Sequence, residues 1–243
     1  MSRAPHAVIL AAGMSRRLRP LTEERPKCLL QVGARTILDW QLHALYAIGV
    51  RNVAVVVGYR REQIKEHVLA RWSHLNFSFI ENIDYETTNT LFSLAYALAA
   101  LPQGDFYYLN ADVVLHRELL ERLRVQQDGG FLAVDRRQCR EEEVKVQTVG
   151  DRIAAIGKHL LPSACAGEFV GVAKFSGAFA AAFREKVAAL AVAGNEMRYF
   201  ECALDAMAGE VAITLVDITG IPCIEVDFIE DYEFAVQHVG ARL

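Results

Sequence analysis

Short apolar runs alternate with amphipathic stretches through the first half of the chain. The apolar runs are rich in β-branched and aromatic residues and predict strands at Ala7–Ala11, Asn52–Val57, Phe77–Ile80 and Phe106–Leu109. Apolar residues at helical spacing predict helices between them at Thr36–Ile48, Arg61–Trp72 and Thr90–Ala100. Strands that alternate with helices of this length form right-handed βαβ units. We therefore expect a mainly parallel sheet, with ligands outside the carboxyl ends of its strands.

The second half has a different rhythm, with short strands and few helices between them. The strands are predicted at Phe131–Asp135, Glu143–Thr148, Arg152–Ile156 and Phe169–Ser176, which indicates antiparallel additions to the sheet. The remaining elements are helices at Gly177–Ala193 and Tyr199–Met207, strands at Val211–Asp217 and Cys223–Val226, and a helix from Ile229. The sequence shows neither a repeat nor a linker, so one α/β domain over residues 1–243 is the simplest prediction.

Composition narrows the class of protein. The 243 residues are 53% hydrophobic, enough for a substantial core. A net charge of -4 gives no general attraction to nucleic acid or to an acidic membrane, so a bound polyanion needs a local cluster of cations. The five cysteines are scattered without a CxxC pair, and no apolar run is long enough for a signal peptide or a membrane span. We predict a cytoplasmic protein with reduced thiols and with neither nucleic acid nor membrane as partner.

The loop after the first strand carries the strongest candidate chemistry. In AVILAAGMSRRLRPLTEERPK, the turn residue Gly13 permits close backbone approach, and Arg17 and Lys27 supply positive charge. Backbone amides at the end of a parallel strand, followed by fixed cations, are what a polyphosphate needs. The stretch lacks the GxxxxGK[ST] pattern of a phosphate loop. By themselves, these residues leave open a nucleoside triphosphate site and a solvated basic loop.

Two acids strengthen the case for a triphosphate. Asp112 follows a buried strand directly, and Asp227 ends the short apolar strand in IEVD. Magnesium binds one or two carboxylates together with phosphate oxygens and water, so the two acids are candidate Mg²⁺ ligands. Each of them also precedes a helical stretch and could be a helix cap instead. Lys145 lies in a strand pattern with charge on one face, which fits either a ligand contact or a solvated face.

These motifs carry a family resemblance. LAAGMSRRL, ERPK, LNADVV and IEVDFIEDY resemble the sugar-phosphate-type nucleotidyltransferases over nearly the whole chain. DYETTNTLFSL and the closing IEVDFIEDYEFA are similar to the branch of cytidylyltransferases that activate phosphocholine and phosphonates, and Ser15 stands where the family has a second glycine. The resemblance implies a Rossmann-like three-layer sandwich of the nucleotide-diphospho-sugar transferase type, with a mainly parallel mixed sheet. It places nucleotide binding at about residues 1–115 and substrate binding at about residues 116–243.

The resemblance also implies roles for individual residues. Arg17 and Lys27 would be catalytic, Asp112 and Asp227 would hold the metal, and Lys145 would hold the phosphate of the second substrate. The nucleotide-binding residues would be Leu10, Ala11, Ala12, Gly13, Ser15, Arg17, Lys27, Thr88, Asn89, Ser93 and Asn110. A cationic second substrate needs aromatic faces and an acid, for which Tyr199, Phe200 and Glu201 are the candidates; the two aromatics are equally well explained as core residues of a helix.

The expected reaction is attack by a phosphate or phosphonate oxygen on the α-phosphorus of CTP, with Mg²⁺ as cofactor and pyrophosphate as leaving group. The acceptor would be of the phosphocholine or 2-aminoethylphosphonate type. A sugar- or inositol-1-phosphate nucleotidyltransferase that uses CTP, UTP or dTTP is the alternative, and a non-catalytic nucleotide-binding module is a further one. A Rossmann oxidoreductase expects an acid at the end of the second strand, where this chain has Gly58 and Tyr59. A homodimer stays open, because the apolar helix Thr90–Ala100 suits a core and an interface equally.

Overall fold

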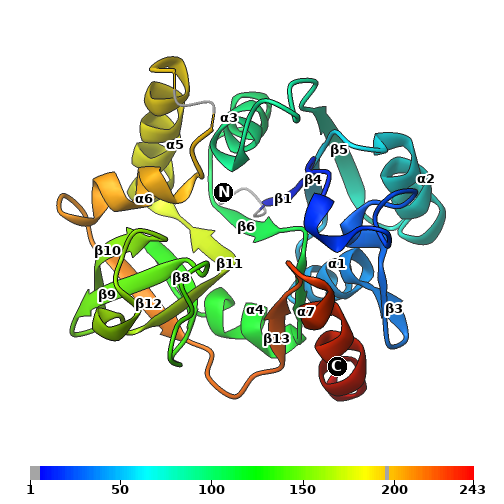
Figure 1. Cartoon of the computed structure of the whole chain (residues 1–243). Coiled ribbons are helices and arrows are strands. Elements are labelled where there is room, and N and C mark those ends of the chain that lie inside the picture. The colour runs from blue at the N-terminus through cyan, green and yellow to red at the C-terminus, as the bar shows by residue number, and fades with distance from the viewer. Residues whose placement is uncertain (1–5, 195–196) are drawn as a thin grey trace.

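The amino-terminal half builds the parallel part of a nine-stranded sheet. The computed structural model describes residues 6–194 and 197–243, and the strand order is β5-β4-β1-β6-β11-β8-β12-β10-β9 (Figure 1). The first four of these strands run parallel and are β5 (Asn76–Glu81), β4 (Asn52–Val57), β1 (His6–Ala11) and β6 (Phe106–Asn110). β1 reads as a continuous apolar run because both of its faces are covered.

The carboxyl-terminal half extends this sheet and curls it. Its strands are β8 (Gly130–Asp135), β9 (Lys145–Val149), β10 (Arg152–Gly157), β11 (Gly167–Phe175) and β12 (Ile213–Asp217). β11 runs antiparallel to β6 and pairs with both β8 and β9, so β11, β8, β12, β10 and β9 follow one another around a closed ring. The predicted antiparallel additions are confirmed, since β11 runs antiparallel to β6, β8 and β9, and β10 runs antiparallel to β9. The later strand β12, for which no direction was predicted, runs parallel to β8.

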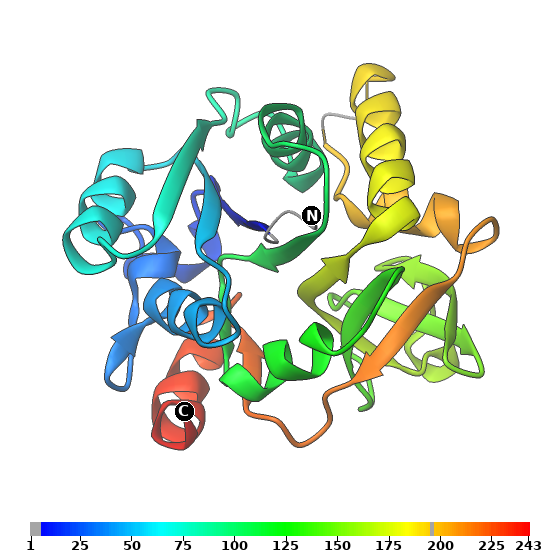
Figure 2. The ribbon, with the colours of Figure 1, turned by 180° about the vertical axis from the view of Figure 1, so that it is seen from behind.

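Helices cover both faces of the sheet, which confirms the three-layer sandwich (Figures 1 and 2). One face is packed by α1 (Ile37–Ala47), α2 (Arg61–Arg71) and α4 (Arg117–Arg124). The other face is packed by α3 (Thr90–Ala100), α5 (Gly177–Val192) and α6 (Glu201–Ala208). The apolar side of α3 belongs to this core, since Leu91, Leu94 and Ala97 are fully buried. Within the described ranges, no helix is both long and apolar enough to cross a membrane.

A third, smaller core joins the two ends of the chain. It contains Leu18 from the loop after β1, Val114 from β7 (Val113–Leu115), and Val226, which follows β13 (Cys223–Glu225). The hairpin of β2 (Gln31–Val32) and β3 (Arg35–Thr36), helix α7 (Ile229–Phe234) and the turns that follow it complete this region. β7 pairs antiparallel with β13, so a segment about a hundred residues later in the chain lies beside the end of β6.

The pairing of β7 with β13 also decides between two interpretations of the acids. Asp112 is followed by a strand, and the cap of α4 is His116, whose ring Nδ1 accepts from the Glu118 backbone N–H. Helix α7 has Phe228 at its cap position. Neither Asp112 nor Asp227 therefore serves as a helix cap, and both carboxylates are free for other partners.

Candidate active site

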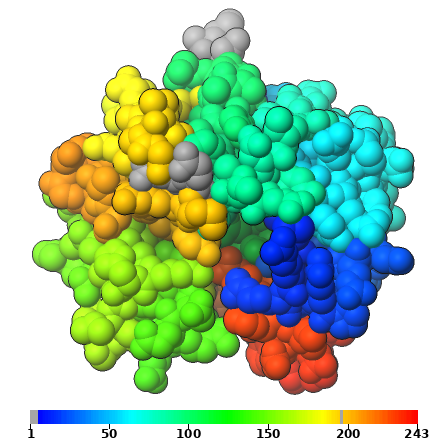
Figure 3. Space-filling view, turned by 45° about the horizontal axis from the view of Figure 1, so that its top comes forward, coloured from blue at the N-terminus to red at the C-terminus, as the bar shows by residue number. Residues whose placement is uncertain are grey.

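The predicted site residues gather in a cleft at the carboxyl ends of β1 and β6. Figure 3 shows the hollow near the centre of this face, bordered by the blue loop after β1, by green and yellow segments, and by the red carboxyl-terminal segment. Its walls come from both halves of the chain, so no single sequence motif forms it. The predicted residues that line it are Leu10, Ala11, Gly13, Ser15, Arg17, Lys27, Asn89, Asn110, Asp112, Tyr199, Glu201 and Asp227.

Lys27 sits between the two predicted metal carboxylates. Its Nζ lies 2.7 Å from Asp112 Oδ2 and 3.1 Å from Asp227 Oδ1. Burial by itself would lower the pKa of Lys27, but the two carboxylates outweigh burial and hold this pKa well above its usual value. The pKa of Asp227 is lowered, because Lys27 and Arg17 outweigh the effect of its burial. Lys27 and Asp227 therefore both favour their charged forms in this cleft.

Arg17 is fixed by the turn that leads into it. Its Nη2 lies 3.1 Å from Asp227 Oδ2, and its guanidinium packs over the Phe228 ring at 4.7 Å. Ser15 adopts the left-handed conformation (φ 49°), which glycine adopts without strain. The Thr22 hydroxyl donates to the Ser15 carbonyl at 2.9 Å and holds this turn closed. Serine therefore keeps the backbone shape expected of glycine at the position where the loop leaves the family pattern.

Asp112 is held by its backbone and keeps one carboxylate oxygen free. Buried Gln41 donates to the carbonyls of Asn110 and Val113, on either side of Asp112, at 2.7 and 2.8 Å. The Val226 N–H donates to the Asp112 carbonyl at 3.1 Å. Asp112 Oδ1 is buried and has no hydrogen-bond partner among the described residues. A buried carboxylate oxygen without a partner lowers the stability of the fold unless a bound ligand supplies the missing contact.

The acids of the cleft fit a magnesium ion that arrives with a polyphosphate. Among the described residues, no group of three or more His, Cys, Asp or Glu side chains could hold a metal ion by itself. Mg²⁺ does not require such a group, since it takes one or two carboxylates and completes its shell with phosphate oxygens and water. Asp112, with its unpartnered Oδ1, and Asp227 match that donor set.

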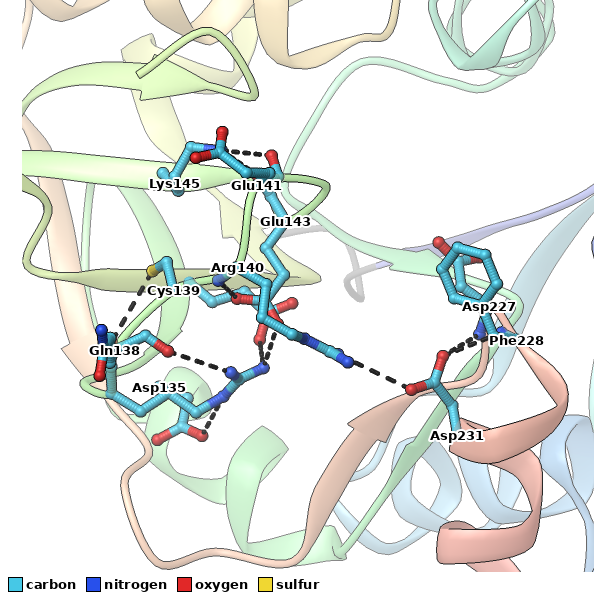
Figure 4. Close-up of polar contacts among 12 residues, drawn as sticks. Asp135, Gln138, Cys139, Arg140, Glu141, Glu143, Lys145, Asp227, Phe228 and Asp231 are labelled. Atoms are coloured by element: carbon cyan, nitrogen blue, oxygen red, sulfur yellow. Dashed lines mark hydrogen bonds and ion pairs between the residues drawn. The ribbon is translucent and has the colours of Figure 1, made fainter. Parts of the chain in front are cut away.

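Asp231 positions the backbone around Asp227. Figure 4 shows its carboxylate on α7 pointing to this backbone, where Oδ2 accepts from the N–H groups of Asp227 at 3.1 Å and Phe228 at 2.9 Å. From the loop before β9, Arg140 reaches Asp231 Oδ1 at 3.7 Å and Glu143 Oε1 at 2.7 Å. The contacts of Arg140 link the second half of the chain to the Asp227 segment.

Glu225 and Asn110 form the floor of the cleft. Asn110 Nδ2 donates to Glu225 Oε1 at 3.2 Å, and the Tyr108 hydroxyl donates to Asn110 Oδ1. Gly171 has φ +70°, and a Cβ there would lie 2.5 Å from Asn110 Nδ2, so glycine leaves the space that Asn110 occupies. Burial and the nearby charges of Asp112 and Asp227 raise the pKa of Glu225 well above its ordinary value. Sequence analysis missed Glu225, although its place two residues before Asp227 at the end of a predicted strand was a usable signal.

The opposite wall consists of Lys158, Tyr199 and Glu201. The Lys158 Nζ lies over the Tyr199 ring, 4.9 Å from its centroid. Glu201 begins α6 and is only 5% exposed. Burial raises its pKa to about 7, with a smaller effect of the Asp112 charge in the same direction, against the lowering effects of a hydrogen bond from its own backbone N–H and of Lys158. Sequence analysis missed Lys158, whose only signal was its place directly after a strand and Gly157.

Two of the predicted acceptor residues lie outside this wall. Lys145 is fully buried, and its Nζ donates to the backbone carbonyls of Glu141 at 2.6 Å and Glu143 at 3.2 Å (Figure 4). Lys145 is not among the residues that line the cleft, so the structure does not bring this predicted phosphate partner together with the others. Phe200 is fully buried and packs on Tyr108 with ring centroids 4.0 Å apart, which makes it a core residue.

Three predicted nucleotide-binding residues support the cleft without lining it. Thr88 and Ser93 accept hydrogen bonds from Asn82 Nδ2, each at 3.0 Å, and so shape the loop before α3. The Ala12 carbonyl accepts from the Tyr59 N–H at 2.9 Å. Their side chains and this carbonyl are engaged inside the protein. Asn89, by contrast, caps α3 through Thr90 N–H at 2.8 Å and does line the cleft.

Comparison with known proteins gives phosphonate and phosphocholine cytidylyltransferases together with sugar-phosphate nucleotidyltransferases. A family model described as the MobA-like NTP transferase domain matches residues 7–190. The CMP-5'-(3-aminopropyl)phosphonate synthase of Streptomyces rubellomurinus is 37% identical over 130 residues, which are 54% of this chain and 20% of that protein's length. The CTP:phosphoglutamine cytidylyltransferase of Campylobacter jejuni is 27% identical over 255 residues, covering 96% of this chain and 99% of that protein.

A solved structure supports the same fold. The structure of CTP:phosphocholine cytidylyltransferase from Streptococcus pneumoniae matches with a TM-score of 0.79 at 22% identity, and covers 95% of this chain and 97% of that one. At this level of identity the likeness concerns the fold. It confirms the nucleotide-diphospho-sugar transferase type predicted from the sequence.

Proposed function

The chain belongs to the MobA-like NTP transferase family, and from this premise we propose that it is a cytidylyltransferase. It would join CTP to a small phosphate or phosphonate compound and release pyrophosphate. The observation that carries the proposal is the contact of Lys27 with Asp112 and Asp227 in one cleft, with Arg17 beside them. CTP is the favoured nucleotide because the names of two relatives specify CTP or a CMP product.

The proposed reaction needs neither a general base nor a covalent intermediate on the protein. A phosphate or phosphonate oxygen is already an anion near neutral pH, so it can attack the α-phosphorus of CTP without a general base. Lys27 and Arg17 would offset the charge of the triphosphate as pyrophosphate leaves. Asp112 and Asp227 would hold Mg²⁺, whose charge further stabilises the leaving pyrophosphate. Catalysis is then positioning plus charge stabilisation.

The acceptor would bind against the wall opposite Arg17. Lys158 is the cation on this side of the cleft and takes the place that sequence analysis gave to Lys145 as the partner of the acceptor's phosphate. The other groups here include Val144 and Phe169 beside Tyr199 and Glu201. The neutral polar residues Asn89 and Thr90 also line the cleft, but Asn89 Oδ1 already accepts from the Thr90 N–H and Thr90 Oγ1 from the Phe200 N–H. A hexose or inositol phosphate needs several neutral polar partners for its hydroxyl groups. This composition favours a small, charged acceptor.

Pyrophosphate release tests the proposal directly. The purified protein is assayed with Mg²⁺ and each of CTP, UTP, dTTP and ATP. Acceptors are 2-aminoethylphosphonate, phosphocholine, inositol 1-phosphate and glucose 1-phosphate. We expect turnover with CTP and with an acceptor of the first two kinds. Turnover only with a sugar phosphate and UTP or dTTP would overturn the cytidylyltransferase proposal, and CTP binding without pyrophosphate from any acceptor would indicate a non-catalytic module.

A variant pair tests the metal carboxylate. Asp112→Asn should reduce turnover by about 100-fold or more while the fold persists, since it removes a charge that faces the metal and Lys27. Asp151→Asn is the matched control, because the Asp151 side chain is 82% exposed and lies outside the cleft. Wild-type turnover in Asp112→Asn with Mg²⁺ as the metal would contradict the assignment.

A further inference from the structure

Two carboxylate oxygens in the cleft are buried and unpartnered among the described residues. One is Oδ1 of Asp112, a proposed metal ligand, and the other is Oε2 of Glu201, a residue of the acceptor wall. Glu225, the other buried acid on the floor, already accepts from Asn110. Because a buried carboxylate oxygen without a partner is costly, each of the two unpartnered oxygens points to a ligand that completes it.

Among the described residues, no side chain forms an ion pair or a hydrogen bond with the unpartnered Glu201 Oε2. A carboxylate at the first turn of a helix such as α6 gains from the helix dipole, but it gains this at the surface as well. Lys158 is near enough to affect the pKa of Glu201, yet none of the ion pairs found among the described residues involves Glu201. The unpartnered oxygen is therefore available to a cation that enters the cleft.

The aromatic groups of this wall are largely engaged. Lys158 lies over one face of the ring of Tyr199, which is still 44% exposed, and the fully buried Phe200 packs on Tyr108. Phe169 is 1% exposed and meets Phe200 edge to face. A quaternary ammonium has no N–H group and depends on open aromatic faces. A primary ammonium has three N–H donors and pairs with a carboxylate through charge-assisted hydrogen bonds.

We propose that Glu201 binds the ammonium group of the acceptor, so that the enzyme selects a small phosphate or phosphonate with a primary amine over one with a quaternary ammonium. The inference rests on the proposed cytidylyltransferase function and adds a specificity residue to it. The ammonium would meet Glu201 while the acceptor's phosphorus group lies near Lys158. Asp112, Lys158 and Glu201 line the same cleft, so the acceptor that joins them has a short chain between phosphorus and nitrogen.

A matched series of acceptors tests the inference in the wild-type protein. Phosphoethanolamine and phosphocholine differ only in three N-methyl groups, and ethyl phosphate lacks the nitrogen. With CTP and Mg²⁺, kcat/KM should be about 10- to 100-fold higher for phosphoethanolamine than for either of the others, as expected for one charge-assisted hydrogen bond. Equal or higher kcat/KM for phosphocholine or ethyl phosphate would overturn the inference but leave the cytidylyltransferase function standing. Absence of pyrophosphate with every acceptor would instead count against the function itself.

The variant Glu201→Gln assigns the effect to this side chain. It should lower kcat/KM for phosphoethanolamine by about 10- to 100-fold, and leave ethyl phosphate turnover and the KM for CTP nearly unchanged. Glu185→Gln, on the exposed side of α5, is the matched control. An equal loss with ethyl phosphate would show that Glu201 acts on the fold or on the nucleotide rather than on the amine.

Discussion

Replacing Glu201 by glutamine should stabilise the protein without ligand, and should do so more strongly at high pH. Burial raises the pKa of Glu201 from an ordinary 4.5 to about 7. The native protein therefore binds this proton more tightly than the unfolded chain does. Relative to its ionised form, protonated Glu201 contributes most to the unfolding free energy below pH 4.5, and this contribution is lost as the pH rises through about 7. Glutamine has no such proton and removes this dependence.

The magnitude follows from the two pKa values. One pKa unit corresponds to about 1.4 kcal/mol, so ionising Glu201 inside the folded protein costs about 3 kcal/mol at about pH 8, but only about 1 kcal/mol at about pH 5.5. The difference in unfolding free energy between Glu201→Gln and wild type should thus grow by about 2 kcal/mol between these two pH values. The effects of Lys158 and Asp112 on the ionisation of Glu201 are already contained in its raised pKa and are not added again.

Urea unfolding at the two pH values measures this growth, without Mg²⁺ or nucleotide. Comparing the change with pH, rather than the difference at one pH, removes any constant effect of the substitution on packing. Glu185→Gln should show no comparable growth. A difference that stays constant to within about 0.5 kcal/mol would refute the argument that Glu201 is held in a place unfavourable to its charge.

Two further predictions concern the loops that carry the metal and phosphate groups. Asp231→Ala leaves the backbone N–H of Asp227 without its acceptor, so it should destabilise the protein by about 1 kcal/mol. It should also raise the Mg²⁺ concentration needed for half-maximal pyrophosphate release. An equal rise in that concentration for Glu230→Ala, an exposed neighbour on α7, would contradict the prediction. Ser15→Gly removes a serine from the left-handed conformation, so it should increase the unfolding free energy by up to about 1 kcal/mol and raise the thermal midpoint slightly. Activity should be retained. A lower midpoint would show that the serine side chain stabilises the turn.

Much of the fold could be predicted from local pattern. β1 and β4 are buried on both faces, so their apolar runs are continuous, and the helices between them show regular spacing. The predicted bounds of β4 and α3 agree with the structure to the residue. Strands of two or three residues, such as β2, β3 and β7, were missed because they are too short to show a period.

The acceptor wall shows where local pattern fails. Lys145 and Lys158 both adjoin short strands of the second half, and only Lys145 was predicted from the sequence to contact the acceptor. In the structure β9 pairs with both β10 and β11, the Lys145 ammonium donates to backbone carbonyls, and Lys158 lines the cleft. Tyr199 and Phe200 are adjacent as well, yet Tyr199 lines the cleft and Phe200 enters the core.

The sequence by itself determined the layered α/β fold, the basic loop after β1, and the two acids that end short strands, because each is set by neighbouring residues. It also determined the family, through motifs that are short and local. Only the tertiary structure decided that Asp227 lies 3.1 Å from Lys27, 200 residues away, and that Glu201 keeps a buried oxygen without a partner. Such contacts depend on how β13 pairs with β7 and how α6 packs on the sheet, and long-range packing of this kind leaves no periodic trace in the chain.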